Sequence, residues 1–141
     1  MALLFASLLV ICAQIKPGTE SLNIKPWSIS DLEGKWYLQI VPENDSSNNR
    51  IPEIQFDIKQ NRFSGTTGCN QMSGSFLASD STLHISDKMI TTRMFCPGYN
   101  EMVFLQNLLK VDGYYFKNGW LILTYRNTVI SQWSRKKPTR V

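Results

Sequence analysis

Gly65-Thr66-Thr67-Gly68-Cys69-Asn70-Gln71-Met72-Ser73-Gly74-Ser75-Phe76 is the stretch that decides the fold, together with Thr92-Arg93-Met94-Phe95-Cys96 further along the chain. Each segment contains a cysteine, and the first has glycines at 65, 68 and 74 between flanks that are typical of strands. Glycine at such positions lets the backbone bend or adopt a positive φ. The Asn that follows Cys69 can hydrogen-bond within its own loop. We therefore expect a structured loop between two strands here.

The length and composition favour one domain built mostly from strands. The chain has 141 residues, enough for a single core once the N-terminus is set aside. Aromatic residues, Thr and Ser are frequent from residue 34 onward, which favours strands over helices. The net charge of +4 comes largely from residues 135–141, so the rest of the domain is nearly neutral. This pattern predicts a disordered basic tail at 135–141 and no nucleic-acid-binding face.

The N-terminus has the pattern of an export segment. Residues 1–13 are mostly apolar, too short to span a bilayer, and lie where the core of a secretory signal would lie. Cleavage after Ala13 and lipid attachment to Cys12 both stay open, because no basic residue precedes the run and Ile11 is not small. Residues 14–27 mix Pro, Gly and polar residues and predict a linker. We expect an exported protein, periplasmic or envelope-attached, with an N-terminal membrane tether if Cys12 is lipidated.

The domain itself is expected to span residues 28–134. Ser30 and Glu33 have the spacing of a capping box and predict one helical turn. A strand follows at 34–41, with Trp36, Leu38 and Ile40 on one face and Trp36 in the core. Alternating apolar residues and intervening turns predict further strands at 54–58, 62–67, 73–78, 82–86 and 88–93.

The apolar pattern changes period after Pro97. Asn100 can cap a helix that has Glu101 in its first turn and continues to Lys110. Its apolar face is formed by Met102, Val103, Phe104, Leu105, Leu108 and Leu109. Strands at 113–116 and 120–125 flank an Asn118-Gly119 hairpin turn, and a last strand is expected at 128–133. The sequence thus predicts a mostly β fold with about eight strands and one sizeable helix.

Two cysteines lie inside the predicted domain. In an exported protein Cys69 and Cys96 can pair as a disulfide, which we favour. The alternatives are two buried free thiols that pack as small apolar groups, or a reactive cysteine. A reactive cysteine needs a nearby base, and the single histidine, His84, lies in the middle of a predicted strand without a visible partner.

The remaining polar residues do not suggest catalysis. One His and two separated Cys lack the ligand spacing of a zinc or copper site, so we predict no metal and no cofactor. The 65–74 glycines lie between strands rather than before a helix, which does not fit a phosphate loop. Arg93 stands in an otherwise uncharged stretch, so we expect it to be partly buried, with acceptors from loop carbonyls or from Glu101.

Taken in order, these segments resemble the META domain family, the HslJ-like heat-shock lipoproteins of bacterial envelopes. The resemblance covers residues 30–134 and rests on Trp36, Glu101, Leu105 to Leu109 and the closing hairpin from Gly119 to Tyr125, together with the two cysteine segments. The structural motif residues that it picks out are Gly68, Cys69, Asn70, Gly74, Thr92, Arg93, Met94 and Cys96. The N-terminus departs from the family pattern, because its lipid-attachment motif is poor.

The resemblance implies a compact antiparallel, lipocalin-like barrel or sheet with a packed helix. It also implies a non-catalytic, exported envelope protein, a monomer that acts in heat or envelope stress tolerance through unidentified protein partners. Gly34-Lys35-Trp36 also looks like the opening of a lipocalin, so a carrier of a small apolar ligand is one alternative. A secreted inhibitor that presents a disulfide-pinned loop to a protease is another.

Overall fold

The computed structural model describes residues 26–40 and 51–138 of the chain. The predicted export segment with Cys12, the linker up to residue 25 and the side chain of Ile40 lie outside the described residues.

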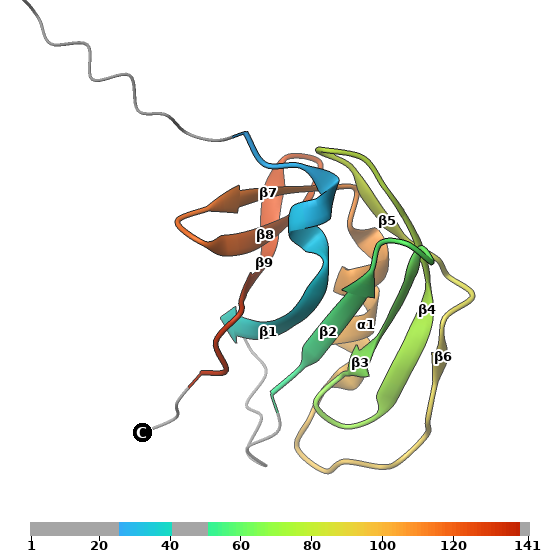
Figure 1. The fold of residues 1–141 in the computed structure, drawn as a ribbon. Helices are drawn as coiled ribbons and strands as arrows, with labels where there is room; N and C mark the ends of the chain where they lie inside the picture. Colours follow the sequence, from blue (N-terminus) through green and yellow to red (C-terminus); the bar gives the residue numbers. More distant parts are fainter. Residues whose placement is uncertain (1–25, 41–50, 139–141) are drawn as a thin grey trace, which may run out of the picture.

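Within the described residues, nine antiparallel strands form one strongly curved sheet, which confirms the mostly β prediction (Figure 1). The strands follow the order β5-β4-β3-β2-β1-β9-β8-β7, and β6 pairs with β4. The elements are η1 (Ile29–Leu32), β1 (Gly34–Ile40), β2 (Glu53–Asp57), β3 (Arg62–Thr66), β4 (Gln71–Ala78), β5 (Leu83–Ile85), β6 (Ile90–Thr91), α1 (Glu101–Lys110), β7 (Gly113–Lys117), β8 (Trp120–Tyr125) and β9 (Thr128–Ser134). The neighbours β1 and β9 therefore come from opposite ends of the domain.

Tight turns set the register of the hairpins. Asn118 and Gly119 have φ angles of 52° and 79°, so the Asn-Gly turn between β7 and β8 has the two positive φ values that suit a twisted hairpin. Arg126 and Asn127 repeat this geometry between β8 and β9, with φ angles of 49° and 62°. The predicted hairpin turns are thus present. Arg126 has a positive φ although arginine rarely adopts one.

The two edge strands of the sheet, β5 and β7, meet at one end only. An isolated bridge joins Thr82, just before β5, to Gly113 at the start of β7. The Tyr114 N–H donates to the Ser81 carbonyl oxygen at 3.0 Å across this seam. A Cβ at Gly113 would lie 3.3 Å from the Ser81 carbonyl oxygen across the seam and 2.8 Å from Thr124 Oγ1 on the neighbouring strand, so glycine fits both contacts. The sheet is barrel-like without being closed along its length.

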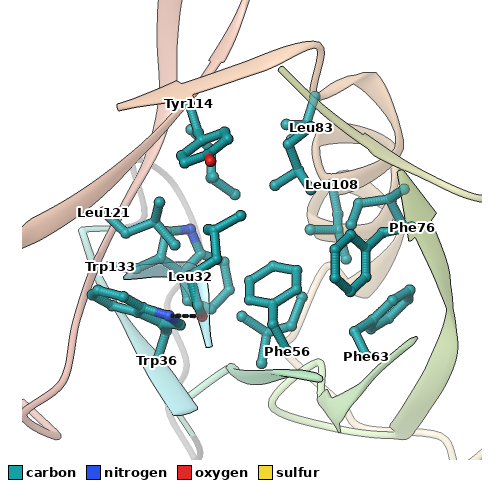
Figure 2. Packing of buried hydrophobic residues seen from close by; sticks show 14 of the residues in the cluster. Leu32, Trp36, Phe56, Phe63, Phe76, Leu83, Leu108, Tyr114, Leu121 and Trp133 are labelled. Atoms are coloured by element: carbon teal, nitrogen blue, oxygen red, sulfur yellow. Dashed lines mark hydrogen bonds between the residues drawn. The ribbon is translucent and has the colours of Figure 1, made fainter. Parts of the chain in front are cut away.

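Large apolar side chains fill the inside of the curved sheet (Figure 2). Phe56 and Phe76 meet edge to face with ring centroids 5.1 Å apart. The Trp36 indole N–H donates to the Leu32 carbonyl oxygen at 2.9 Å, so η1 is fixed to the core. Helix α1 contributes Phe104, whose ring lies 6.3 Å from that of Trp133. The core is thus packed by side chains from the sheet, η1 and α1.

Two expectations about local structure need correction. The cap of η1 is formed by Ser28, whose N–H donates to Asp31 Oδ2 at 2.7 Å, and not by Ser30 and Glu33. Glu33 instead accepts from the Ile58 N–H at 2.8 Å, which links η1 to the end of β2. The strand expected at 88–93 shortens to β6, because only Ile90 and Thr91 pair with β4.

The buried face of α1 is narrower than its apolar residues suggest. Phe104 and Leu108 are buried and Leu105 packs against the core. Met102 is 68% exposed, so the expectation that it belongs to the packed face is wrong. The reason is that α1 contacts the sheet mainly near β5, and one side of its first turn faces solvent.

The basic tail is ordered at its start, contrary to the expectation of disorder from residue 135. The Arg135 guanidinium lies 3.7 Å from the centroid of the Trp36 ring and donates to the carbonyl oxygens of Asp31 at 2.9 Å and Lys35 at 3.2 Å. Burial lowers the pKa of Arg135, while Asp31 and Glu33 act in the opposite direction. Near the start of the described residues, the Trp27 indole N–H donates to the Asp80 carbonyl oxygen at 3.0 Å.

Candidate functional site

A disulfide joins Cys69 to Cys96, with their Cα atoms 6.0 Å apart. Cys69 lies in the loop between β3 and β4 and is buried, whereas Cys96 lies in the segment that leads from β6 to α1. The bridge favoured from the sequence is thus present in the structure, and neither thiol is free in it. It fastens the β6–α1 segment to the end of the sheet.

The loop around Cys69 is organised by Thr67, which is fully buried. Its hydroxyl oxygen accepts from the N–H groups of Cys69 at 3.1 Å and Asn70 at 2.9 Å. Its own N–H donates to the Asn70 carbonyl oxygen at 2.9 Å, which closes the turn. Gly68 has a φ of 94°, where other residues are strained. The glycine and the threonine together make this tight turn possible.

Asn70 is the centre of the polar contacts and is 1% exposed. Its amide oxygen accepts from the Met94 N–H at 2.6 Å and from the Thr92 hydroxyl at 2.8 Å. Its amide nitrogen donates to the Met94 carbonyl oxygen at 3.1 Å and to Glu101 Oε2 at 2.9 Å. All of these partners come from the segment beyond β6, so the Asn70 side chain holds that segment against the β3–β4 loop.

Glu101 is the first residue of α1 and directs its carboxylate at the same loop. It accepts hydrogen bonds from the Thr67 hydroxyl and from Asn70. A carboxylate at a helix N-terminus is also stabilised by the helix dipole. Tyr99 donates its hydroxyl to the Thr67 carbonyl oxygen. Burial raises the pKa of Tyr99 well above its usual range, and the nearby Glu101 carboxylate raises it further.

We call this arrangement the Asn70 clamp. It consists of the Cys69–Cys96 disulfide and the side chains of Thr67, Asn70, Thr92, Tyr99 and Glu101. Of the residues singled out from the sequence, Gly68, Cys69, Asn70, Thr92, Met94 and Cys96 meet here.

Two of the predicted motif residues have other roles. Gly74 lies within β4, where a Cβ would be 2.9 Å from the Phe63 ring, so it makes room for the core. Arg93 is exposed, so the expectation that it is partly buried, with acceptors from loop carbonyls or from Glu101, is wrong. Because the Met94 backbone is held by Asn70, the Arg93 side chain lies on the solvent side of the segment.

Sequence reasoning missed the roles of Thr67 and Tyr99 and the partners of Glu101. Thr67 stands three residues before Asn70, a spacing that allows a side-chain-capped turn, and this was the available signal. Glu101 was expected in the first helical turn, but its contact with Thr67 spans 34 residues and has no local signature.

The clamp leaves a group of apolar side chains in solvent on the segment that it holds. Phe95 is 89% exposed, the highest value among the large apolar residues described. The others between residues 90 and 103 are Ile90 at 70%, Met102 at 68%, Met94 at 56% and Val103 at 38%. We refer to these five side chains as the 90–103 patch.

Neither a metal-binding cluster nor a membrane-spanning helix is found among the described residues. Within residues 26–40 and 51–138, no group of three or more His, Cys, Asp and Glu side chains is placed to hold a metal ion. Neither η1 nor α1 is long and apolar enough to cross a membrane. His84 lies in β5 opposite Leu77 and outside the Asn70 clamp.

The fold and the clamp define a disulfide-containing domain with a curved antiparallel sheet and one packed helix. The META domain family model matches residues 20–137, so the chain belongs to the META domain family. A comparison with curated proteins gave no match.

Two solved structures show the same fold. One is a protein from Burkholderia xenovorans, with 21% identity, a TM-score of 0.57, and coverage of 87% of this chain and 98% of the other. The second is a DUF4847 family protein from Bacteroides vulgatus, with 16% identity, a TM-score of 0.59, and coverage of 77% and 96%. At these identities the likeness concerns the fold alone.

Proposed function

We propose that this protein is a non-catalytic, exported domain of the cell envelope that supports heat or envelope stress tolerance through contacts with other proteins. The observation that carries the proposal is the Asn70 clamp. Its polar side chains are hydrogen-bonded to one another and to backbone groups. They therefore hold a loop in position and are not placed as reactive groups in a cleft.

The disulfide within the clamp supports the exported location. Such bridges persist in oxidising compartments and are rare in reducing ones. The bridge adds a covalent link between two segments that also meet through hydrogen bonds and the short pairing of β6, so its loss would affect the whole β6–α1 connection. A protein that depends on this bridge is suited to the periplasm or the envelope surface.

The packing of the core argues against the alternative of a lipocalin-like carrier. A carrier needs an open apolar cavity of roughly 300 Å³ or more inside the sheet. Here Trp36, Phe56 and Phe63 are each at most 3% exposed and fill that space together with α1. A ligand of useful size could enter only by displacing several of these side chains.

The location can be tested by fractionating cells that express the full chain from its own gene. We expect the protein in the periplasmic or membrane fraction, with Cys69 and Cys96 linked under non-reducing mass spectrometry. A matched Cys12→Ser variant separates lipid attachment from signal cleavage, because only lipid attachment requires the thiol. A cytoplasmic protein with alkylatable thiols at both positions would refute the proposal.

The stress role can be tested separately in a deletion strain. We expect reduced survival after heat shock, restored by the wild-type chain and not by an Asn70→Ala variant that lacks the clamp. A Gly119→Ala variant serves as a control for a modest loss of stability, because its positive φ costs about 1 kcal/mol while no atom lies within 4 Å of a Cβ at that turn. Equal survival of the deletion strain and the wild type would contradict the stress role without affecting the location.

A further inference from the structure

The 90–103 patch is unusual for its concentration of exposed apolar groups. Of the nine exposed large apolar residues among those described, five lie between Ile90 and Val103. Scattered apolar side chains on a surface are ordinary, but so many on one stretch of chain favour a contact surface there. Figure 1 shows the β6–α1 connection at the bottom of the view, at the opposite end from the start of the described chain. The patch therefore lies at the far end of the domain from the point where the described residues begin.

The backbone beneath the patch is already hydrogen-bonded inside the protein. The N–H and the carbonyl oxygen of Met94 both bond to Asn70, and the Thr92 N–H donates to the Gln71 carbonyl oxygen at 3.0 Å. The Tyr99 N–H donates to the Cys96 carbonyl oxygen at 3.3 Å. Polar backbone groups that enter a lipid environment must be paired within the protein, because lipid tails offer no partners. The Asn70 clamp meets this requirement for Met94, the residue that precedes Phe95.

The charged side chains on the same segment favour an anionic surface. Arg93 and Lys88 are both exposed, and their long apolar stems allow the charge to remain at headgroup level. Asp87 is also exposed and offsets part of this charge. The Glu101 carboxylate is turned inward to Thr67 and Asn70. A protruding apolar side chain with a cationic residue two positions before it matches the interface of an anionic bilayer.

We propose that the 90–103 patch inserts into the headgroup region of anionic lipid bilayers, with Phe95 as the main anchor and Arg93 and Lys88 bound to lipid phosphates. The clamp fixes the loop before it meets the bilayer, so little conformational entropy is lost on binding. This proposal goes beyond the proposed function, because it concerns lipid instead of protein and holds or fails whatever the partner proteins are.

The test is co-sedimentation of the full chain with vesicles of phosphatidylcholine alone or with about one third phosphatidylglycerol. Using the full chain keeps the contribution of residues 1–25 equal in every variant. We expect stronger binding to the anionic vesicles and a loss of about tenfold or more for Phe95→Ser, as expected when a buried phenyl group is removed. Arg93→Gln should weaken binding to anionic vesicles by roughly fivefold and have little effect on neutral ones.

Leu77→Ser is the matched control, because Leu77 is 72% exposed but lies near the far end of β4 from the clamp. It should bind vesicles like the wild type. In a second variant, Phe95→Trp, the emission in excess of that of the wild type, which has four tryptophans, should be blue-shifted and quenched by brominated acyl chains. Equal binding of wild type and Phe95→Ser, or an indole emission at position 95 that stays unquenched, would overturn the proposal. So would photo-crosslinking from position 95 to a protein, a protease included, in the absence of vesicle binding.

Discussion

Asn70 and Met94 are joined by two hydrogen bonds, in which the Asn70 side chain pairs with the Met94 backbone as a neighbouring strand would. The amide oxygen of Asn70 accepts from the Met94 N–H at 2.6 Å, and its amide nitrogen donates to the Met94 carbonyl oxygen at 3.1 Å. One buried side chain thereby replaces strand pairing at a point where β6 has already ended. The segment beyond β6 keeps its position because of this pair and the disulfide.

Replacing Asn70 by Ala should lower the free energy of unfolding by about 3 kcal/mol, because several buried partners lose their hydrogen bonds at once. Asn70→Asp should be worse at neutral pH, since it places a second carboxylate beside Glu101 in place of a donor. Urea unfolding at pH 7 and pH 4 measures both variants. At pH 4 the free energy of unfolding of Asn70→Asp should rise relative to that of Asn70→Ala. If the difference between the two variants is the same at pH 7 and pH 4, the assigned orientation of the Asn70 amide is contradicted.

Removing the disulfide should also destabilise the domain. The Cys69→Ala and Cys96→Ala double variant opens a loop of sequence separation 27. The chain-entropy estimate for a loop of this size is about 3.5 kcal/mol. Adding a reductant to the wild type should lower its free energy of unfolding by most of the loss seen in the double variant. If reductant leaves the unfolding midpoint unchanged, the bridge does not contribute to stability.

Gly65 and Gly119 offer a matched pair of glycine substitutions. A Cβ at Gly65 would lie 2.0 Å from the Glu53 carbonyl oxygen on the neighbouring strand, so Gly65→Ala must push β2 and β3 apart. We expect a loss of about 3 kcal/mol or more, in the range of other overpacked sites. Gly119→Ala meets no atom within 4 Å and should cost only about 1 kcal/mol for its positive φ. Thermal unfolding of both variants decides between a steric and a conformational role for Gly65.

Ionisation of Tyr114 should lower the stability of the domain at alkaline pH. Burial raises the pKa of Tyr114 to about 12, and the carboxylates of Asp80 and Asp31 act in the same direction. Its hydroxyl donates to the Ser79 carbonyl oxygen at 2.6 Å, a bond that ionisation removes. Because the folded pKa lies above the unfolded value of about 10, the contribution is complete below pH 10 and is lost as the pH rises through about 12.

The measurement is urea unfolding between pH 9 and pH 12 on wild type and Tyr114→Phe. The Phe variant starts from a lower stability, since it lacks the hydrogen bond to Ser79, but should lose less as the pH rises. Tyr99, whose pKa is also raised, contributes equally to both proteins and cancels in the comparison. Parallel curves for the two proteins would show that Tyr114 is not responsible for the alkaline loss.

Arg135 should contribute to stability although it lies in a run of basic residues. Arg135→Ala removes the stacking on Trp36 and the bonds to the backbone of Lys35 and Asp31. We expect a loss of about 1 kcal/mol, the usual size for a partly exposed cation on an aromatic ring. Arg135→Lys should recover only part of it, because an ammonium cannot stack in plane. The neighbouring Lys136→Ala should have no measurable effect on urea unfolding.

The sequence predicts best where local chemistry decides the structure. The Asn118-Gly119 turn, the Asn100 cap of α1 and the alternating residues of β2 each depend on neighbours in the chain, and all are present. The two cysteines could be paired because few alternatives existed. Arg93 was misjudged because the direction of its side chain depends on how Asn70 holds the Met94 backbone.

Contacts between distant residues account for the other differences. Glu101 could be placed in the first turn of a helix, but no local pattern shows that Thr67 and Asn70 are its partners. The charge run at 135–141 is typical of a disordered tail, yet Arg135 finds an aromatic ring about a hundred residues away in the chain. Such partners become visible only when the strand order brings β1 beside β9.

That strand order also has a consequence for synthesis. Tyr37 pairs with Ser134, so the central strand β1 lacks one of its two neighbours until nearly the whole domain has been made. The sheet is therefore completed only once β9 has been made, because this long-range pairing comes last.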